Sequence, residues 1–164
     1  MTKYKKLSWL AVFLWMALIF YLSHQPSSVS SELSSGITEF IINAAEKLVP
    51  DIGIDLRDFH YIVRKNAHFI AYFILGILSI NAIKSDKISG KHSIFLALGI
   101  SVLYAMSDEF HQLFIAGRSG EVRDVFIDSS GALAGIVIYS GVMRIRKIKK
   151  PYLKKNFYSE EIEK

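Results

Sequence analysis

Four long apolar stretches dominate the pattern of the chain. They cover residues Leu7–Leu22, Tyr61–Ile83, Ile94–Ile115 and Val125–Met143. Each is close to the length of about 20 residues that an α-helix needs to cross the hydrocarbon core of a bilayer. A helix of this size in a soluble bundle carries a polar stripe, whereas the middles of these stretches have none. The pattern therefore predicts an all-α protein, a four-span transmembrane helix bundle.

The first stretch has one other interpretation, a signal peptide, because three lysines precede its short apolar core. The residues that follow it are Ser23-His24-Gln25-Pro26, which contain no small-x-small cleavage site. Removal of a signal peptide needs such a site. We therefore interpret the stretch as a retained first span.

The connection after the first span has a helical pattern of its own. Apolar residues recur at spacings of three and four positions, at Ile37, Phe40, Ile41, Ala44 and Leu48. This spacing predicts an amphipathic interfacial helix in the first outer loop, and Pro50 and Gly53 end it. A helix that only covers the bundle as a lid would have the same pattern.

Charged residues are distributed unequally between the two sides of the predicted bundle. Basic residues gather before the first span, between the second and third, and after the fourth, whereas residues 23–60 hold six acidic and two basic residues. Loops rich in Lys and Arg stay in the cytoplasm. We therefore expect a multi-pass protein of the cytoplasmic (plasma) membrane with both termini cytoplasmic. Residues 1–150 form its transmembrane domain, and residues 151–164 form a tail with basic and acidic residues.

The overall composition excludes several classes of protein. With 51% hydrophobic residues and a formal net charge of +5, the chain is neither disordered nor low in complexity. We interpret the basic tail as an orientation signal held near anionic lipid. It is not expected to bind nucleic acid, since no aromatic-rich or helix-turn-helix context accompanies it. The chain has no cysteine, which excludes disulfides, thiolate nucleophiles and cysteine-bound zinc.

Ionisable and amide residues converge on the outer ends of three spans. They are Arg64, Lys65, Asn66 and His68 at the second span, Asp108, Glu109, His111 and Gln112 at the third, Arg118, Glu121 and Arg123 in the turn after it, and Asp124 and Asp128 at the fourth. Charged groups at this depth are costly and face the bundle interior or a water-filled cavity. The sequence therefore predicts one outward-facing polar layer.

Helical spacing places these residues on shared faces. The three sets are Lys65, His68 and Tyr72; Tyr104, Asp108, His111 and Gln112; and Asp124, Asp128, Gly131 and Gly135. The two glycines, four residues apart, allow a neighbouring helix to approach closely. That approach would bring the two aspartates of the fourth span against another span.

The polar layer is balanced in charge. Four cations, Arg64, Lys65, Arg118 and Arg123, match four carboxylates, Asp108, Glu109, Asp124 and Asp128. A closed network that only fixes helix register is one explanation. We favour a binding pocket, because apolar residues would pack the helices at lower cost. The candidate ligand-binding residues are Lys65, His68, Tyr72, Asp108, Gln112, Arg118, Arg123, Asp124 and Asp128.

The same layer contains histidines and carboxylates, which are the residue types that bind metals or act in acid–base catalysis. Four cationic side chains share it and no H-E-x-x-H spacing occurs, so neither a metal nor another cofactor is expected. If the protein is an enzyme, Glu109 and His111 are the candidate catalytic residues, one of them as general base. Ser107 or Tyr72 would be a nucleophile only with a base within hydrogen-bond reach.

Several of these motifs together resemble the VanZ-like family. They are Lys65-x-x-His68-x-x-x-Tyr72, Ser107-Asp108-Glu109-Phe110-His111-Gln112, Gly117-Arg118, Asp124-Val125, Gly131-x-x-x-Gly135 and the Ser23-His24-Gln25-Pro26 stretch. The resemblance extends from about the first span through the fourth. It implies a small multi-span bacterial membrane protein, and the family's namesake is linked to low-level resistance to teicoplanin, a lipoglycopeptide that acts at the outer face of the cytoplasmic membrane.

Three functions stay open at this point. The first is binding of an anionic head group or envelope component, with membrane lipid, a lipid-linked envelope component or a lipoglycopeptide as partner. The second is an enzyme acting on a lipid-linked envelope substrate by His/Glu acid–base chemistry. The third is a transporter, against which the sequence argues because four spans show no internal repeat and no charge at mid-membrane.

Overall fold

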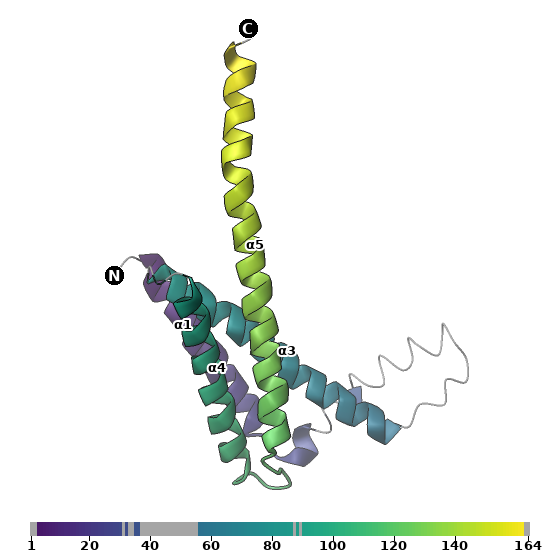
Figure 1. Cartoon of the computed structure of the whole chain (residues 1–164). Coiled ribbons are helices and arrows are strands. Elements are labelled where there is room, and N and C mark those ends of the chain that lie inside the picture. The colour runs from purple at the N-terminus through teal and green to yellow at the C-terminus, as the bar shows by residue number, and fades with distance from the viewer. Residues whose placement is uncertain are drawn as a thin grey trace, which may run out of the picture.

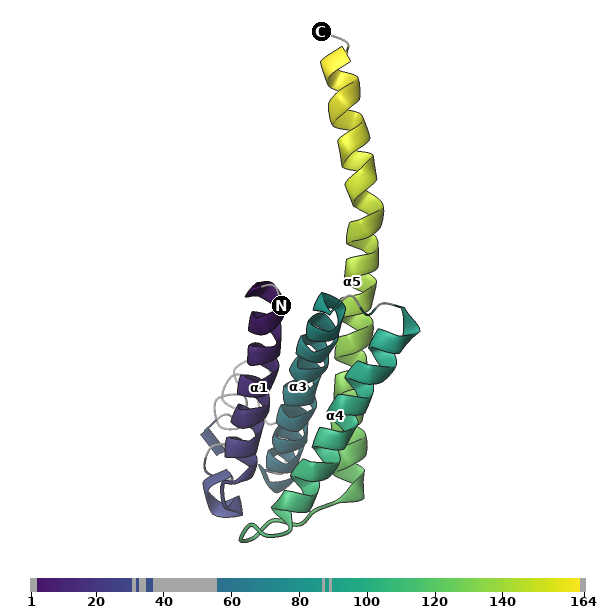
Figure 2. The same ribbon diagram turned by 90° about the vertical axis from the view of Figure 1, so that its left-hand side faces the viewer.

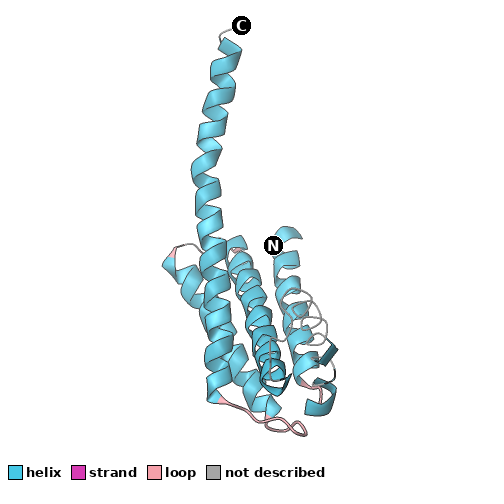
Figure 3. Cartoon of the chain, turned by 90° about the vertical axis from the view of Figure 1, so that its right-hand side faces the viewer, coloured by secondary structure: helices cyan, strands magenta, loops and turns pink. Residues whose placement is uncertain are grey.

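The computed structural model contains one long helix for each of the four apolar stretches (Figure 1). It describes residues 3–30, 32, 35–36, 56–86, 88 and 90–162. The helices are α1 (Lys3–Ser23), α3 (Leu56–Ser85), α4 (Lys91–Gln112) and α5 (Val122–Ile162). Figure 3 shows helices and loops, with no strand among the described residues. The predicted all-α fold is confirmed. The interfacial helix predicted around Ile37–Leu48 lies outside the described residues.

Each helix contains a segment long and apolar enough to cross a membrane. These segments are Lys3–Ser23, Ile62–Ser85, Lys91–Gln112 and Val122–Arg146. Large apolar side chains cover the outward faces, for example Phe13, Phe95 and Phe126, which are 62%, 71% and 72% exposed. Faces of this kind are costly in water and suit lipid. The chain is therefore a multi-pass membrane protein.

Helix α4, which forms the third span, ends three residues before the end of the span that the sequence predicts. The sequence predicts a span to Ile115, but α4 ends at Gln112. The N–H groups of Phe114 and Ile115 bond to carbonyls only three residues earlier, and Gly117 adopts a φ of 73°. Tight i→i+3 bonds followed by a left-handed glycine end a helix, and here they begin the turn that leads into α5.

The helices run side by side, and the bundle has two distinct ends (Figure 2). The start of α1, the connection between α3 and α4, and the point where α5 leaves the bundle lie at one end. The turn between α4 and α5 lies at the other. The three basic segments thus share one end of the molecule, and the turn of the polar layer lies at the opposite end.

Glycines allow α3 and α5 to pack backbone against backbone. A Cβ atom added at Gly131 would lie 2.3 Å from the carbonyl oxygen of Phe69, and one added at Gly135 would lie 2.2 Å from that of Phe73. From α3, a Cβ atom at Gly76 would lie 2.3 Å from the carbonyl oxygen of Ala132. The close approach predicted from Gly131 and Gly135 is confirmed, and α3 is the helix that makes it.

Hydrogen bonds to backbone carbonyls hold α1 in place. The Trp15 indole N–H donates to the carbonyl oxygen of Ala71 in α3 at 2.8 Å, and the Tyr104 hydroxyl of α4 donates to that of Met16 at 2.5 Å. Between the helices lies a core that includes Val12, Ile19, Tyr72, Leu75, Ala105 and Ala132. These contacts fix α1 beside α3 and α4, whose polar residues gather at the end of the bundle that holds the α4–α5 turn.

Candidate functional site

The polar layer is built around buried carboxylates at the end of the bundle that holds the α4–α5 turn. Asp108, Glu109 and Gln112 of α4 and Asp128 of α5 are 5% exposed or less. Spacings of three and four residues place the three α4 side chains on neighbouring positions of one helix face. Buried carboxylates are costly unless they are paired or hydrogen-bonded, so the position of every polar partner matters.

An ion pair joins α3 to α5 at this end. The Lys65 ammonium contacts both carboxylate oxygens of Asp124, and Glu121 lies 3.8 Å away. The side chains of Lys65 and Asp124 are 14% and 12% exposed. The glycines described above let these same two helices approach closely. The ion pair between Lys65 and Asp124 therefore depends on the close packing of α3 on α5.

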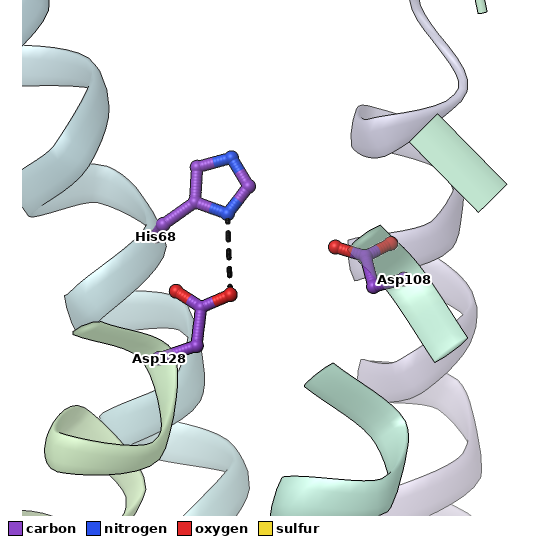
Figure 4. A group of neighbouring side chains, drawn as sticks. All are labelled: His68, Asp108 and Asp128. Atoms are coloured by element: carbon purple, nitrogen blue, oxygen red, sulfur yellow. Dashed lines mark ion pairs between the residues drawn. The ribbon is translucent and has the colours of Figure 1, made fainter. Parts of the chain in front are cut away.

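A second group brings together one residue from each of three helices. His68 Nδ1 of α3 lies 3.7 Å from Asp128 Oδ2 of α5. Asp108 of α4 faces them across the same space (Figure 4). One ligating atom from each of the three side chains lies within 4.8 Å of the others. From α1, Ser23 Oγ donates to Asp108 Oδ2 at 2.8 Å.

Arg118 and Gln112 connect the α4–α5 turn to the end of α1. Arg118 Nε donates to the carbonyl oxygen of Gln25 at 2.9 Å, and its terminal nitrogens donate to Leu22 O at 3.2 Å and Gln112 Oε1 at 3.3 Å. The Gln112 amide donates in turn to Asp108 and to Glu109. Burial lowers the pKa of the Arg118 guanidinium, and the nearby positive charge of Arg64 lowers it further.

Both carboxylate oxygens of Glu109 accept hydrogen bonds. Its Oε2 accepts the backbone N–H of Glu121 at 2.9 Å, and its Oε1 accepts the Gln112 amide at 3.3 Å. Both carboxylate oxygens are therefore used to position the α4–α5 turn and its neighbour in α4.

The histidine proposed as an alternative general base lies beside a second histidine. His111 Nε2 and His24 Nδ1 are 3.1 Å apart, with their rings stacked at 5.3 Å, and Phe20 packs against His111. Among the described residues, the histidine that pairs with a carboxylate is His68. The sequence placed His111 correctly at this end of the bundle but did not reveal its partner.

Most of the candidate site residues are brought together. Lys65, His68, Tyr72, Asp108, Glu109, Gln112, Arg118, Asp124 and Asp128 are buried or half-buried on the inner faces of α3, α4, α5 and the turn. Arg123 and Ser107 are exposed and lie outside this cluster. The Tyr72 hydroxyl is buried without a hydrogen-bond partner in the described part of the chain.

Two further residues belong to the site. Ser23 donates to Asp108, and Arg64 lines the cavity described next. Both carry a signal in the sequence, because Ser23 follows the first span directly and Arg64 precedes Lys65. What it did not give was the rotation of each helix, which decides the side chains that face inward.

A cavity of about 430 Å³ lies beside the cluster, between α1 and α3 at the same end of the bundle. Ile19, Leu22, Val63, Ala67 and Ala71 form its apolar wall. Its polar lining consists of Ser23, Gln25, Ser30, Arg64, His68 and Arg118. A cavity of this volume, largely apolar with a few converging polar groups, is typical of a small-molecule site.

A comparison with known families now identifies the chain. The model of the VanZ/LLP1 family matches residues 8–145, which include most or all of each of the four membrane-spanning segments and the whole polar cluster. The chain belongs to the VanZ/LLP1 family. The resemblance seen in the sequence motifs is thereby confirmed. Neither the curated proteins nor the solved structures that were compared give a match. Within this VanZ/LLP1 protein, the geometry of the cluster and its cavity is the basis for any functional inference.

Proposed function

We propose that this VanZ/LLP1 protein binds the anionic head group of a membrane lipid or lipid-linked envelope component at the outer face of the cytoplasmic membrane. By holding such molecules it alters the cell surface so that a lipoglycopeptide such as teicoplanin is less effective. The observation that carries the proposal is the cavity between α1 and α3, which combines an apolar wall with two arginines.

The cavity suits a ligand with a charged end and an apolar end. Arg64 and Arg118 supply positive charge, and His68 and Ser23 supply directional hydrogen-bonding groups. Guanidinium groups bind phosphate and carboxylate oxygens in a bidentate manner. Ile19 and Leu22 of α1 and Val63 of α3 offer the apolar surface on which an acyl chain packs. These features are those of a phosphate-bearing amphiphile.

Arg64 is the cation best placed to meet a ligand. Arg118 already donates to two backbone carbonyls and to Gln112. Arg64 is half-buried in the cavity wall and makes no hydrogen bond or ion pair with the other described residues. A half-buried guanidinium at the end of a membrane span is costly unless an anion or water satisfies it. This supports Arg64 as the primary contact for the head group.

The proposed location follows from charge asymmetry. The three basic segments share the opposite end of the bundle, which supports a cytoplasmic location for that end and for both termini. The cavity would then open at the outer face, where teicoplanin acts.

A resistance assay with matched arginine variants tests the function. Expression in a susceptible bacterium is expected to reduce teicoplanin susceptibility, and Arg64→Gln is expected to abolish this effect at unchanged membrane abundance. Arg123→Gln is the control, because Arg123 is a cation of the same end of the bundle with an exposed side chain. Loss of the effect in both variants, or in neither, would contradict the proposal.

A further inference from the structure

We propose that His68, Asp108 and Asp128 form a site for one divalent transition-metal ion, with Zn²⁺ and Mn²⁺ as the best-matched ions. The proposal goes beyond the head-group function and does not depend on it. The sequence alone argued against a metal, because four cations share the polar layer. In the structure, three of these cations face other groups or solvent.

The first observation is convergence from three helices. One nitrogen of His68 and one oxygen each of Asp108 and Asp128 lie within 4.8 Å of one another, and the three side chains point into the same space (Figure 4). For three atoms no more than 4.8 Å apart, some point lies within about 2.8 Å of all three. Closing to metal–ligand distances near 2.1 Å then needs shifts of about 0.7 Å or less. Side-chain rotations of this size leave the helices in place.

The second observation is independent of that distance. Asp128 is fully buried, and among the described residues neither of its carboxylate oxygens has a hydrogen-bond donor, since His68 Nδ1 lies 3.7 Å away. Asp108 is 3% exposed and has one oxygen without a donor in the same part of the chain. Buried carboxylate oxygens in native proteins are paired, hydrogen-bonded or bound to a metal. A divalent cation at this position would satisfy the open oxygens and neutralise two carboxylates in one step.

Lys65 and Arg118, two of the four cations of the layer, have other partners, and Arg64 lies in the cavity wall. Lys65 contacts Asp124, Arg118 donates to Gln112 and to two backbone carbonyls, and the Arg123 side chain is exposed. The partner of Asp108 is the neutral Ser23 hydroxyl, together with the Gln112 amide. Hydrogen bonds that orient a ligating carboxylate are typical of metal sites.

The donor set selects the class of ion. One imidazole nitrogen and two carboxylates suit Zn²⁺ or Mn²⁺. Soft metal ions prefer sulfur ligands, and Mg²⁺ prefers oxygen ligands alone. His68 also lines the cavity between α1 and α3. That cavity provides the access route for the ion and room for water or a ligand oxygen as a further ligand.

The test measures metal stoichiometry and affinity on the purified full-length protein in detergent. After treatment with chelator and removal of the chelator, the protein is titrated with Zn²⁺, Mn²⁺ and Co²⁺, the last followed by its visible absorption. We expect one ion per chain for wild type, and affinity lowered at least about tenfold in Asp128→Asn. Glu121→Gln is the control, since it removes a carboxylate at the same end that is not a proposed ligand.

Folding is monitored so that a negative result has one meaning. The metal ion is expected to raise the unfolding temperature of wild type and of Glu121→Gln but not of Asp128→Asn. If Asp128→Asn does not fold, Asp108→Asn and His68→Gln replace it with the same expectation. The proposal is overturned if wild type binds no stoichiometric ion, if folded ligand variants bind as wild type does, or if Glu121→Gln loses as much affinity as they do.

Discussion

The close packing of α3 on α5 should control both the stability of the bundle and the geometry of its polar site. The test perturbation is Gly131→Ala. The added Cβ atom would lie 2.3 Å from the carbonyl oxygen of Phe69, so the helices must separate by roughly 1 Å to reach an ordinary contact. Overpacking of this kind costs about 1–3 kcal/mol. We expect the free energy of unfolding to fall by that amount.

The assay is denaturation by SDS in mixed micelles, followed by the fluorescence of Trp9 and Trp15. Alanine also has a higher helix propensity than glycine, by about 0.5–1 kcal/mol, and Gly141→Ala isolates this effect. Gly141 belongs to the same helix, and no atom lies within 4 Å of its would-be Cβ. We expect Gly141→Ala to be neutral or stabilising. Equal stabilities for the two variants would refute the reasoning.

Three further predictions concern the polar layer and its orientation. Arg118→Lys should lose about 1–3 kcal/mol of stability in the same denaturation assay, because lysine cannot reproduce three donors in a fixed fork. The control Arg123→Lys should stay close to wild type. Equal losses of stability in the two variants would count against the described role of Arg118. Asp124→Asn should cost about 2–3 kcal/mol, because the largely buried Lys65 ammonium loses the carboxylate that it contacts through both oxygens. The double variant Lys65→Met/Asp124→Leu should recover most of the loss, and no recovery would contradict a paired role. Because the chain has no cysteine, a single introduced cysteine reports the side of the membrane on which it lies. Ser119→Cys should react with a membrane-impermeant maleimide in intact cells, and Lys91→Cys should react only after permeabilisation. The opposite pattern would invert the proposed orientation.

The sequence predicted the architecture because the bilayer imposes a strong pattern. Spans of about 20 apolar residues are recognised without tertiary information, and the structure has all four. The end of α4, where the helix is shorter than the predicted span, depends on a tight turn around Gly117. Apolar residues continue to Ile115, so hydropathy alone could not locate that turn.

The site could be predicted as a layer but not as a set of contacts. Helical spacing placed Lys65 and His68 on one face and Asp124 and Asp128 on another, and Gly131 indicated that two helices meet closely. Helical spacing could not show that His68 pairs with Asp128 while His111 pairs with His24. Those pairings depend on how each helix is rotated about its axis and on the order in which helices neighbour one another.

The cavity and the convergent carboxylates were also beyond sequence reasoning. Arg64 was recognised as one of four cations, but its place in the cavity wall depends on the position of α1. Asp108 and Asp128 lie on different helices, and only their common burial shows that oxygens of both lack donors in the described part of the chain.

The central claim is that the cavity beside α1 binds an anionic head group through Arg64. Native mass spectrometry of the purified protein, with equal amounts of phosphatidylglycerol and phosphatidylcholine, tests it most directly. We predict retention of phosphatidylglycerol by wild type and by Arg123→Gln, with affinity lowered roughly tenfold or more in Arg64→Gln, as expected for loss of a charged hydrogen bond. Equal retention of the two lipids by wild type, or unchanged phosphatidylglycerol binding in Arg64→Gln, would contradict it.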